Sequence, residues 1–230
     1  MPTETKQQIV SRQRTRDHGE VYTAEREVNA MLDLVKQETE RIESRFLEPA
    51  CGNGNFLSEV LRRKLDVVAG RYAKSQTEYN RYAVLAVSSI YGIDILEDNV
   101  ENCRERLFGV FNDFYRKTYK TGTPDDVAAS VRYILGKNIV WGDALTFRRV
   151  DRPDDYIVLS EWSPVNGCML KRRDFMFTHL VTANPFADLD LFPETREPNL
   201  FSDSGEEVFI PKPVKEHSLT HYLRLADVQD

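Results

Sequence analysis

One segment, residues 46–57, constrains the fold of this 230-residue chain more than any other. It reads Phe-Leu-Glu-Pro-Ala-Cys-Gly-Asn-Gly-Asn-Phe-Leu: an apolar pair, an acidic residue, a short glycine-rich turn, and a helix-compatible run from Asn55. This order predicts strand, loop and helix, the first half of a nucleotide-binding βαβ unit. The glycines let the backbone approach a ligand closely, and the first turn of the helix offers N–H groups without intrahelical partners.

The spacing within this turn separates two classes of ligand. A dinucleotide-binding loop needs a third glycine, and a P-loop needs a lysine followed by serine or threonine. Here Gly52 and Gly54 are followed by Asn55, Phe56 and Leu57. The spacing therefore disfavours a phosphate as the principal ligand.

The segment from Glu48 to Leu57 resembles the first motif of the class I S-adenosylmethionine (SAM)-dependent methyltransferases, in the form found in enzymes that methylate the amino group of adenine in DNA. The resemblance covers about residues 19–145. It implies an α/β fold of Rossmann-like type, with a central, mostly parallel sheet and helices on both faces. It also implies SAM as cofactor, with no metal.

Two later segments match this family in the expected order. Residues 90–95 predict a strand that ends in Asp94, a carboxylate suited to accept both ribose hydroxyls, followed by Ile95 to stack on adenine. Residues 138–145 predict a third strand ending in Gly-Asp-Ala-Leu, where the resemblance places Asp143 beside the adenine amino group.

Upstream, residues 19–24 resemble a segment that closes over the methionine end of SAM in this family, although Ala24 stands where the family usually has proline. The resemblance thus implies one set of cofactor-binding residues: Tyr22, Thr23, Glu48, Pro49, Ala50, Cys51, Gly52, Asn53, Gly54, Asn55, Phe56, Asp94, Ile95, Asp143 and Ala144.

The catalytic segment is the weakest part of the resemblance. Adenine methyltransferases carry Asn/Asp/Ser-Pro-Pro-Tyr/Phe after the next strand, because the target amino group must donate to two oxygens while the ring stacks on the flipped base. One candidate is Asn184, Pro185 and Phe186, after a predicted strand at 179–183. The other is 160–164 (Ser-Glu-Trp-Ser-Pro), after a predicted strand at 155–159. A degenerate or absent motif is the third possibility.

The charge, cysteine content and hydropathy of the chain limit the kinds of partner and ligand that we expect. The net charge of −6 argues against an extended nucleic-acid footprint and leaves two local basic runs, Arg12/Arg14/Arg16 and Lys171/Arg172/Arg173. Three widely spaced cysteines indicate neither a disulfide framework nor a metal site. No apolar run suits a membrane span and no signal peptide is visible, so we expect a cytoplasmic protein.

The pattern along the chain predicts a flexible arm (1–18), a SAM-binding domain (19–190) and an extended tail (191–230) with exposed His217 and His221. Helices are expected from an N-cap at Thr23 to about 41, and over 71–89, 96–119 and 125–135.

We therefore expect a SAM-dependent methyltransferase of restriction-modification type that acts on adenine in DNA, with target recognition supplied either by this chain or by a partner subunit. One alternative is a non-catalytic or split SAM-binding subunit that needs a partner chain. Another is methylation of RNA or of a protein amide.

Overall fold

A four-stranded sheet of mostly parallel strands forms the centre of the computed structural model, which describes residues 23–181, 200–201, 207–208 and 211–228. The strand order is β1-β2-β3-β4, with β1, β2 and β3 parallel and β4 antiparallel to β3. Parallel strands end at the same edge, so the acidic residues that close the first three strands share that edge. The strands are β1 (Phe46–Glu48), β2 (Ile90–Asp94), β3 (Ile139–Asp143) and β4 (Arg148–Arg149).

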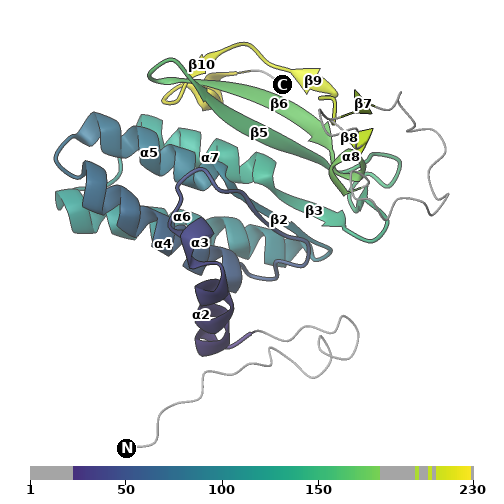
Figure 1. Cartoon of the computed structure of the whole chain (residues 1–230), viewed down its shortest axis with the longest axis horizontal. Coiled ribbons are helices and arrows are strands. Elements are labelled where there is room, and N and C mark those ends of the chain that lie inside the picture. The colour runs from purple at the N-terminus through teal and green to yellow at the C-terminus, as the bar shows by residue number, and fades with distance from the viewer. Residues whose placement is uncertain (1–22, 182–199, 202–206, 209–210, 229–230) are drawn as a thin grey trace, which may run out of the picture.

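Helices connect and support these strands, and together they confirm the expected mixed α/β architecture. In Figure 1, β2 and β3 run between the helices and a long hairpin, and α2 lies at the lower edge, where Val28 and Leu32 are buried in the main core. The core is made by apolar faces of α4, α5, α6 and α7 that pack on the sheet and on one another. The helices are α2 (Glu25–Leu34), α3 (Lys36–Thr39), α4 (Asn55–Tyr72), α5 (Gln76–Ser88), α6 (Glu97–Tyr119), α7 (Asp125–Asn138) and α8 (Phe177–Val181).

Several helix limits differ from the sequence-based expectation. The residue that caps α2 is Ala24, whose side chain cannot accept a hydrogen bond, so the predicted cap at Thr23 is wrong. The expected helix over 71–89 starts late, at Gln76, because the Ser75 hydroxyl accepts from the Glu78 N–H and caps α5 there. The long helix expected over 96–119 is confirmed as α6.

A second sheet is built from a hairpin and the C-terminal segment. β5 and β6 pair antiparallel along their whole length, and β9 and β10 both pair with β6. The expected strand at 155–159 instead begins at Val158 and continues to Val165, so residues 160–164 lie inside a strand. The strands are β5 (Val158–Val165), β6 (Met169–Met176), β9 (Lys215–Glu216) and β10 (Thr220–His221), and a separate short pair is formed by β7 (Leu200–Phe201) and β8 (Glu207–Val208).

Residues 211–228 pack against the body of the protein, where the sequence suggested an extended tail. Tyr222 and Leu225 (the latter in the short 3₁₀ helix η2, Leu225–Asp227) are buried in the main core. His217 is also buried, so the expectation that it is exposed is wrong. In the part of the chain that the structure describes, no helix combines the length and apolarity that crossing a bilayer requires.

Candidate functional site

A cavity of about 560 Å³ opens at the edge of the sheet where β1, β2 and β3 end. Its volume lies in the range of small-molecule sites. Most of the sequence-predicted residues line it: Thr23, Glu48, Pro49, Ala50, Cys51, Gly52, Asn53, Asn55, Phe56, Asp94, Ile95, Asp143 and Ala144. The sequence interpretation missed Leu96, Asn99, Gly142 and Leu145, which follow or precede the acidic strand ends and also line the cavity.

The glycine-rich loop takes its shape from two left-handed residues. Gly52 has φ 51° and Gly54 has φ 81°, values that side chains other than glycine rarely adopt. A Cβ on Gly54 would also lie 2.7 Å from the Cys103 sulfur on α6. Gly54 does not line the cavity, so packing and backbone conformation explain why a glycine is needed there. Gly52 lines the cavity.

Asp94 ties the loop to the second strand. Its Oδ2 accepts a hydrogen bond from the Gly52 N–H at 2.8 Å. Its Oδ1 accepts from the Leu96 N–H at 2.9 Å and from the Asn99 amide at 3.2 Å. A carboxylate offers about four acceptor positions, so capacity remains for a further donor. This carboxylate therefore both positions the loop and stays available to a hydroxyl donor.

Glu48 and Asn53 place buried oxygens in the cavity wall that have no hydrogen-bond partner among the described residues. These atoms are Glu48 Oε2 and Asn53 Oδ1. Burial, together with the nearby charge of Asp94, raises the pKa of Glu48 to about 8. Unpaired buried polar atoms cost free energy and call for an explanation. A ligand that donates hydrogen bonds or carries positive charge would supply one.

The third strand end forms the other wall of the cavity. Asp143 accepts from the Leu145 N–H at 2.9 Å and from the Thr146 hydroxyl at 3.0 Å, which shapes the turn after β3. The indole N–H of Trp141 donates to the Ile95 carbonyl at 3.0 Å and fixes the turn after β2. Leu145 is 90% exposed and Ile95 50% exposed, so two apolar side chains border the cavity and leave contact area for a flat ring.

The cavity is lined by acidic side chains and not by basic ones, among the described residues. Glu48, Asp94 and Asp143 all face the cavity, and no lysine or arginine occurs among the described lining residues. An anionic ligand such as a polyphosphate would meet repulsion here, whereas a cation or a group rich in hydroxyl donors would be attracted.

Cys51 lines the cavity but is not a candidate nucleophile. A hydrogen bond with the Cys103 thiol, followed by burial, raises the pKa of Cys51 well above its ordinary range. A thiol must ionise to react, so Cys51 is a poor nucleophile. Within the described residues, no group of three or more His, Cys, Asp or Glu side chains is placed to hold a metal ion.

The structure separates one catalytic candidate, residues 160–164, from the cavity. Residues 160–164 run inside β5, the Ser160 hydroxyl donates to Asp174 at 2.7 Å, and the Trp162 indole donates to Asn138 at 3.0 Å. None of these residues lines the cavity, so the interpretation of 160–164 as a substrate-positioning loop is wrong.

The other catalytic candidates, Asn184, Pro185 and Phe186, lie outside the described residues, as does Tyr22. The described part of the strand expected at 179–183, residues 179–181, belongs instead to helix α8.

The basic run at 171–173 is neutralised by ion pairs. Lys171 pairs with Glu216 at 3.0 Å, and Arg173 pairs with Glu161 at 3.3 Å. Arg172 is buried and pairs with Asp174 at 2.8 Å. This run is therefore part of the second sheet and does not form a free phosphate-binding patch. Arg12, Arg14 and Arg16 lie outside the described residues.

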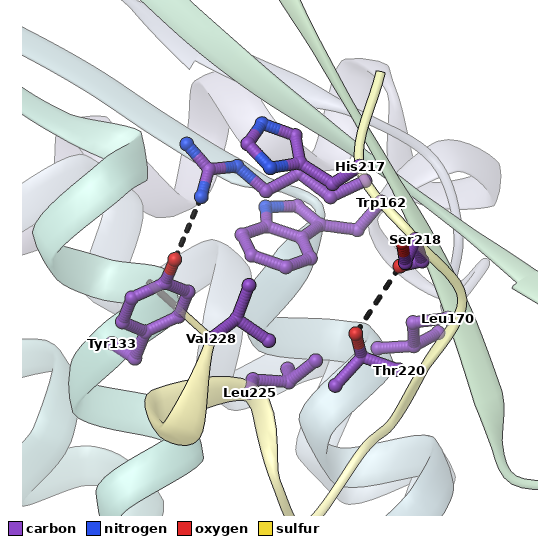
Figure 2. A pocket seen from close by; sticks show the side chains of 9 residues that line it. Tyr133, Trp162, Leu170, His217, Ser218, Thr220, Leu225 and Val228 are labelled. Atoms are coloured by element: carbon purple, nitrogen blue, oxygen red, sulfur yellow. Dashed lines mark hydrogen bonds between the residues drawn. The ribbon is translucent and has the colours of Figure 1, made fainter. Parts of the chain in front are cut away.

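A second, much smaller cavity lies under the C-terminal segment and is shown in Figure 2. In this view Tyr133 lies on one side and Leu170 and Thr220 lie on the other, with Trp162 above and Leu225 below. Its volume of about 10 Å³ accommodates at most a single water molecule. It is a packing void that the buried Arg172 and His217 also line, so the larger cavity is the candidate ligand site.

No protein-family model matches the chain, and searches of curated proteins and of solved structures return no significant match either.

Proposed function

We propose that the larger cavity binds SAM and that the chain has a Rossmann-like class I methyltransferase fold. The observation that carries this proposal is the cavity lining, where three carboxylates end three adjacent parallel strands and no basic side chain accompanies them among the described residues. Ligands of open α/β sheets bind at the carboxyl ends of the strands. A nucleoside with a cationic arm fits this lining better than a nucleotide.

Each strand end has a distinct task in this proposal. Ile95 and Leu145 flank the adenine, and Asp143 accepts from its amino group. Asp94 accepts from the ribose hydroxyls. The loop after β1, with Glu48 and Asn53, surrounds the amino-acid arm, and the unpaired oxygens of these two residues gain donors there. Bound SAM supplies an activated methyl group on a sulfonium, and the residues of the chain hold and orient it.

As the activity, we propose methylation of the exocyclic amino group of adenine in DNA. The three motifs in family order support this assignment, through residues 48–57, Asp94 and Asp143. A specific second function is a SAM-binding subunit that works with a partner chain carrying target recognition and catalysis. Two observations favour it: residues 160–164 are committed to β5, and the basic run at 171–173 is paired.

The test is methyl transfer from labelled SAM to unmethylated genomic DNA by the purified chain. Asp143→Asn and Asn184→Ala are assayed alongside Asp113→Asn, a surface substitution of the same chemistry on α6. Labelling that both test variants abolish and the control retains supports a complete enzyme. SAM binding without labelling of DNA supports the partner-dependent subunit. Absence of SAM binding would contradict both proposals.

A further inference from the structure

Glu48 differs from the two other carboxylates of the cavity in its hydrogen bonding. Asp94 accepts three hydrogen bonds and Asp143 accepts two. The Oε2 atom of Glu48 is buried in the cavity wall, and no described residue donates to it. An ionised carboxylate in such a place lacks the donors that stabilise its charge.

The charged and titratable groups around Glu48 do not supply a counter-charge. β2 contributes Asp94, β3 contributes Asp143 and the loop contributes the un-ionised Cys51 thiol. On the helices, Lys64 of α4 lies over the Phe46 ring and donates to the Ile42 carbonyl and the Ser89 hydroxyl. Arg106 of α6 donates to the Asn55 side chain, and among the described residues neither cation pairs with Glu48. Asn55 and Phe56 of α4 line the cavity without charge.

We infer that Glu48 is a protonated, neutral acid in the free protein and gives up its proton when the cationic arm of the nucleoside binds, so that the site selects charged over uncharged nucleosides. The inference rests on the proposed function and adds to it a basis for selectivity. The ligand cation provides the counter-charge that the protein lacks, and the proton passes to solvent as the ion pair forms.

The coupling between proton binding and ligand binding determines whether binding of the cation releases or takes up a proton. Burial and the charge of Asp94 raise the pKa of Glu48 to about 8, so the free protein holds this proton at pH 7. A bound cation favours the ionised form and lowers that pKa. Binding at pH 7 therefore releases roughly one proton, and affinity for the cation rises by about tenfold per pH unit until the pH approaches 8. A neutral nucleoside releases no proton.

The experiment is calorimetric titration of the full chain at pH 7 in phosphate and in Tris, two buffers whose ionisation enthalpies differ. The difference between the two binding enthalpies gives the number of protons released. The probes are SAM and 5′-methylthioadenosine, which shares the base and ribose but carries no charge. Glu48→Gln removes the titrating group with little change of shape, and Glu105→Gln on the exposed face of α6 is its matched control.

We expect roughly one proton released per SAM in the wild type and in Glu105→Gln, and close to none in Glu48→Gln or with 5′-methylthioadenosine. Release of a proton with the neutral nucleoside, or equal release in Glu48→Gln, would overturn the inference. So would SAM binding to the wild type without proton release, a result that leaves the proposed function standing. If the wild type bound neither nucleoside, the proposed function itself would fail, and the inference with it.

Discussion

Lys64 illustrates how one buried side chain positions the site from a distance. Its side chain is fully buried, and its ammonium donates to the Ile42 carbonyl at 3.0 Å, to the Ser89 hydroxyl at 2.7 Å and to the Ser44 carbonyl. Burial lowers its pKa to about 7, against the opposing charges of Glu43 and Glu38. These contacts join α4 to the segment leading into β1, the strand that ends in Glu48.

Replacement of Lys64 by methionine should destabilise the protein by about 1–3 kcal/mol, because the acceptors would remain buried without a donor. Chemical denaturation would measure the free energy of unfolding. Lys74→Met, at an exposed position just after α4, is the control and should have little effect. Equal stabilities of wild type and Lys64→Met would show that these hydrogen bonds do not hold the β1 segment.

In the absence of ligand, ionisation of Glu48 should lower the free energy of unfolding of the protein. Its folded-state pKa of about 8 lies above the ordinary value of 4.5, so the folded protein binds the proton more tightly than the unfolded chain does. Stability conferred by this group is therefore lost as the pH rises from 4.5 to 8. At pH 8 we expect Glu48→Gln to be more stable than the wild type by roughly 1–3 kcal/mol, less than the full linkage value because the side chain keeps some contact with water.

Denaturation curves at pH 5 and pH 8 would measure this difference. The stability gap between Glu48→Gln and the wild type should widen with pH. A gap that is constant over this range would show that Glu48 ionises normally in the folded protein.

At the scale of elements, one glycine before α4 and one within it have opposite roles. Gly54 precedes the helix with a left-handed φ of 81° and packs against Cys103 of α6. Gly70 lies in the last turns of the same helix, and a Cβ there would meet nothing within 4 Å. The first glycine is required by geometry, and the second only adds conformational freedom to the unfolded chain.

Gly54→Ala should destabilise the protein by about 1–3 kcal/mol through backbone strain and the clash with sulfur. Gly70→Ala should stabilise it by about 0.5–1 kcal/mol, because alanine favours the helix. The same denaturation assay measures both variants. Changes of the same sign in the two variants would contradict the structural assignment of these glycines.

The second sheet is fastened to the C-terminal segment by a buried charged network. Asp174 on β6 accepts from the Ser160 hydroxyl, lies 2.8 Å from the His217 ring nitrogen and forms a two-point contact with Arg172. Burial alone would raise the pKa of Asp174, but the hydrogen bonds from Ser160, His217 and Arg172 outweigh it and hold the pKa below its ordinary value. The carboxylate thus binds residue 217 to a strand over 40 positions earlier.

Asp174→Asn should destabilise the protein by about 3–5 kcal/mol at pH 7, because the buried Arg172 would lose its ion pair with Asp174. A depressed folded pKa contributes stability above the unfolded value, which is lost as the pH falls through the folded value. The difference between wild type and variant should therefore shrink below pH 4. Thermal unfolding from pH 3 to pH 7 tests this, and a difference that does not depend on pH would contradict it.

At the scale of the whole molecule, local patterns predicted the parallel strands and their acidic ends well. A strand, a turn and a helix start are short-range features, so the segments around Glu48, Asp94 and Asp143 were recognisable one at a time. Their convergence on one cavity followed from the shared direction of the strands.

Long-range pairing was not predictable in the same way. Lys64, Arg172 and His217 are buried by partners distant in sequence, and no local pattern distinguishes them from surface charges. Residues 160–164 were placed after a strand predicted at 155–159, although Pro164 pairs with Leu170 across the hairpin and the strand continues past it. The register of a hairpin depends on both strands together, so neither strand's sequence by itself was enough to predict it.

Equilibrium binding of SAM to the purified chain tests the central claim most directly. Isothermal titration with SAM and with ATP, using wild type, Asp143→Asn and the surface variant Asp113→Asn, separates a cationic nucleoside site from a phosphate site. We predict saturable one-to-one binding of SAM, weakened about tenfold or more by Asp143→Asn and unchanged by Asp113→Asn, with ATP binding far more weakly. No binding of SAM, or tighter binding of ATP than of SAM, would contradict the assignment of this cavity.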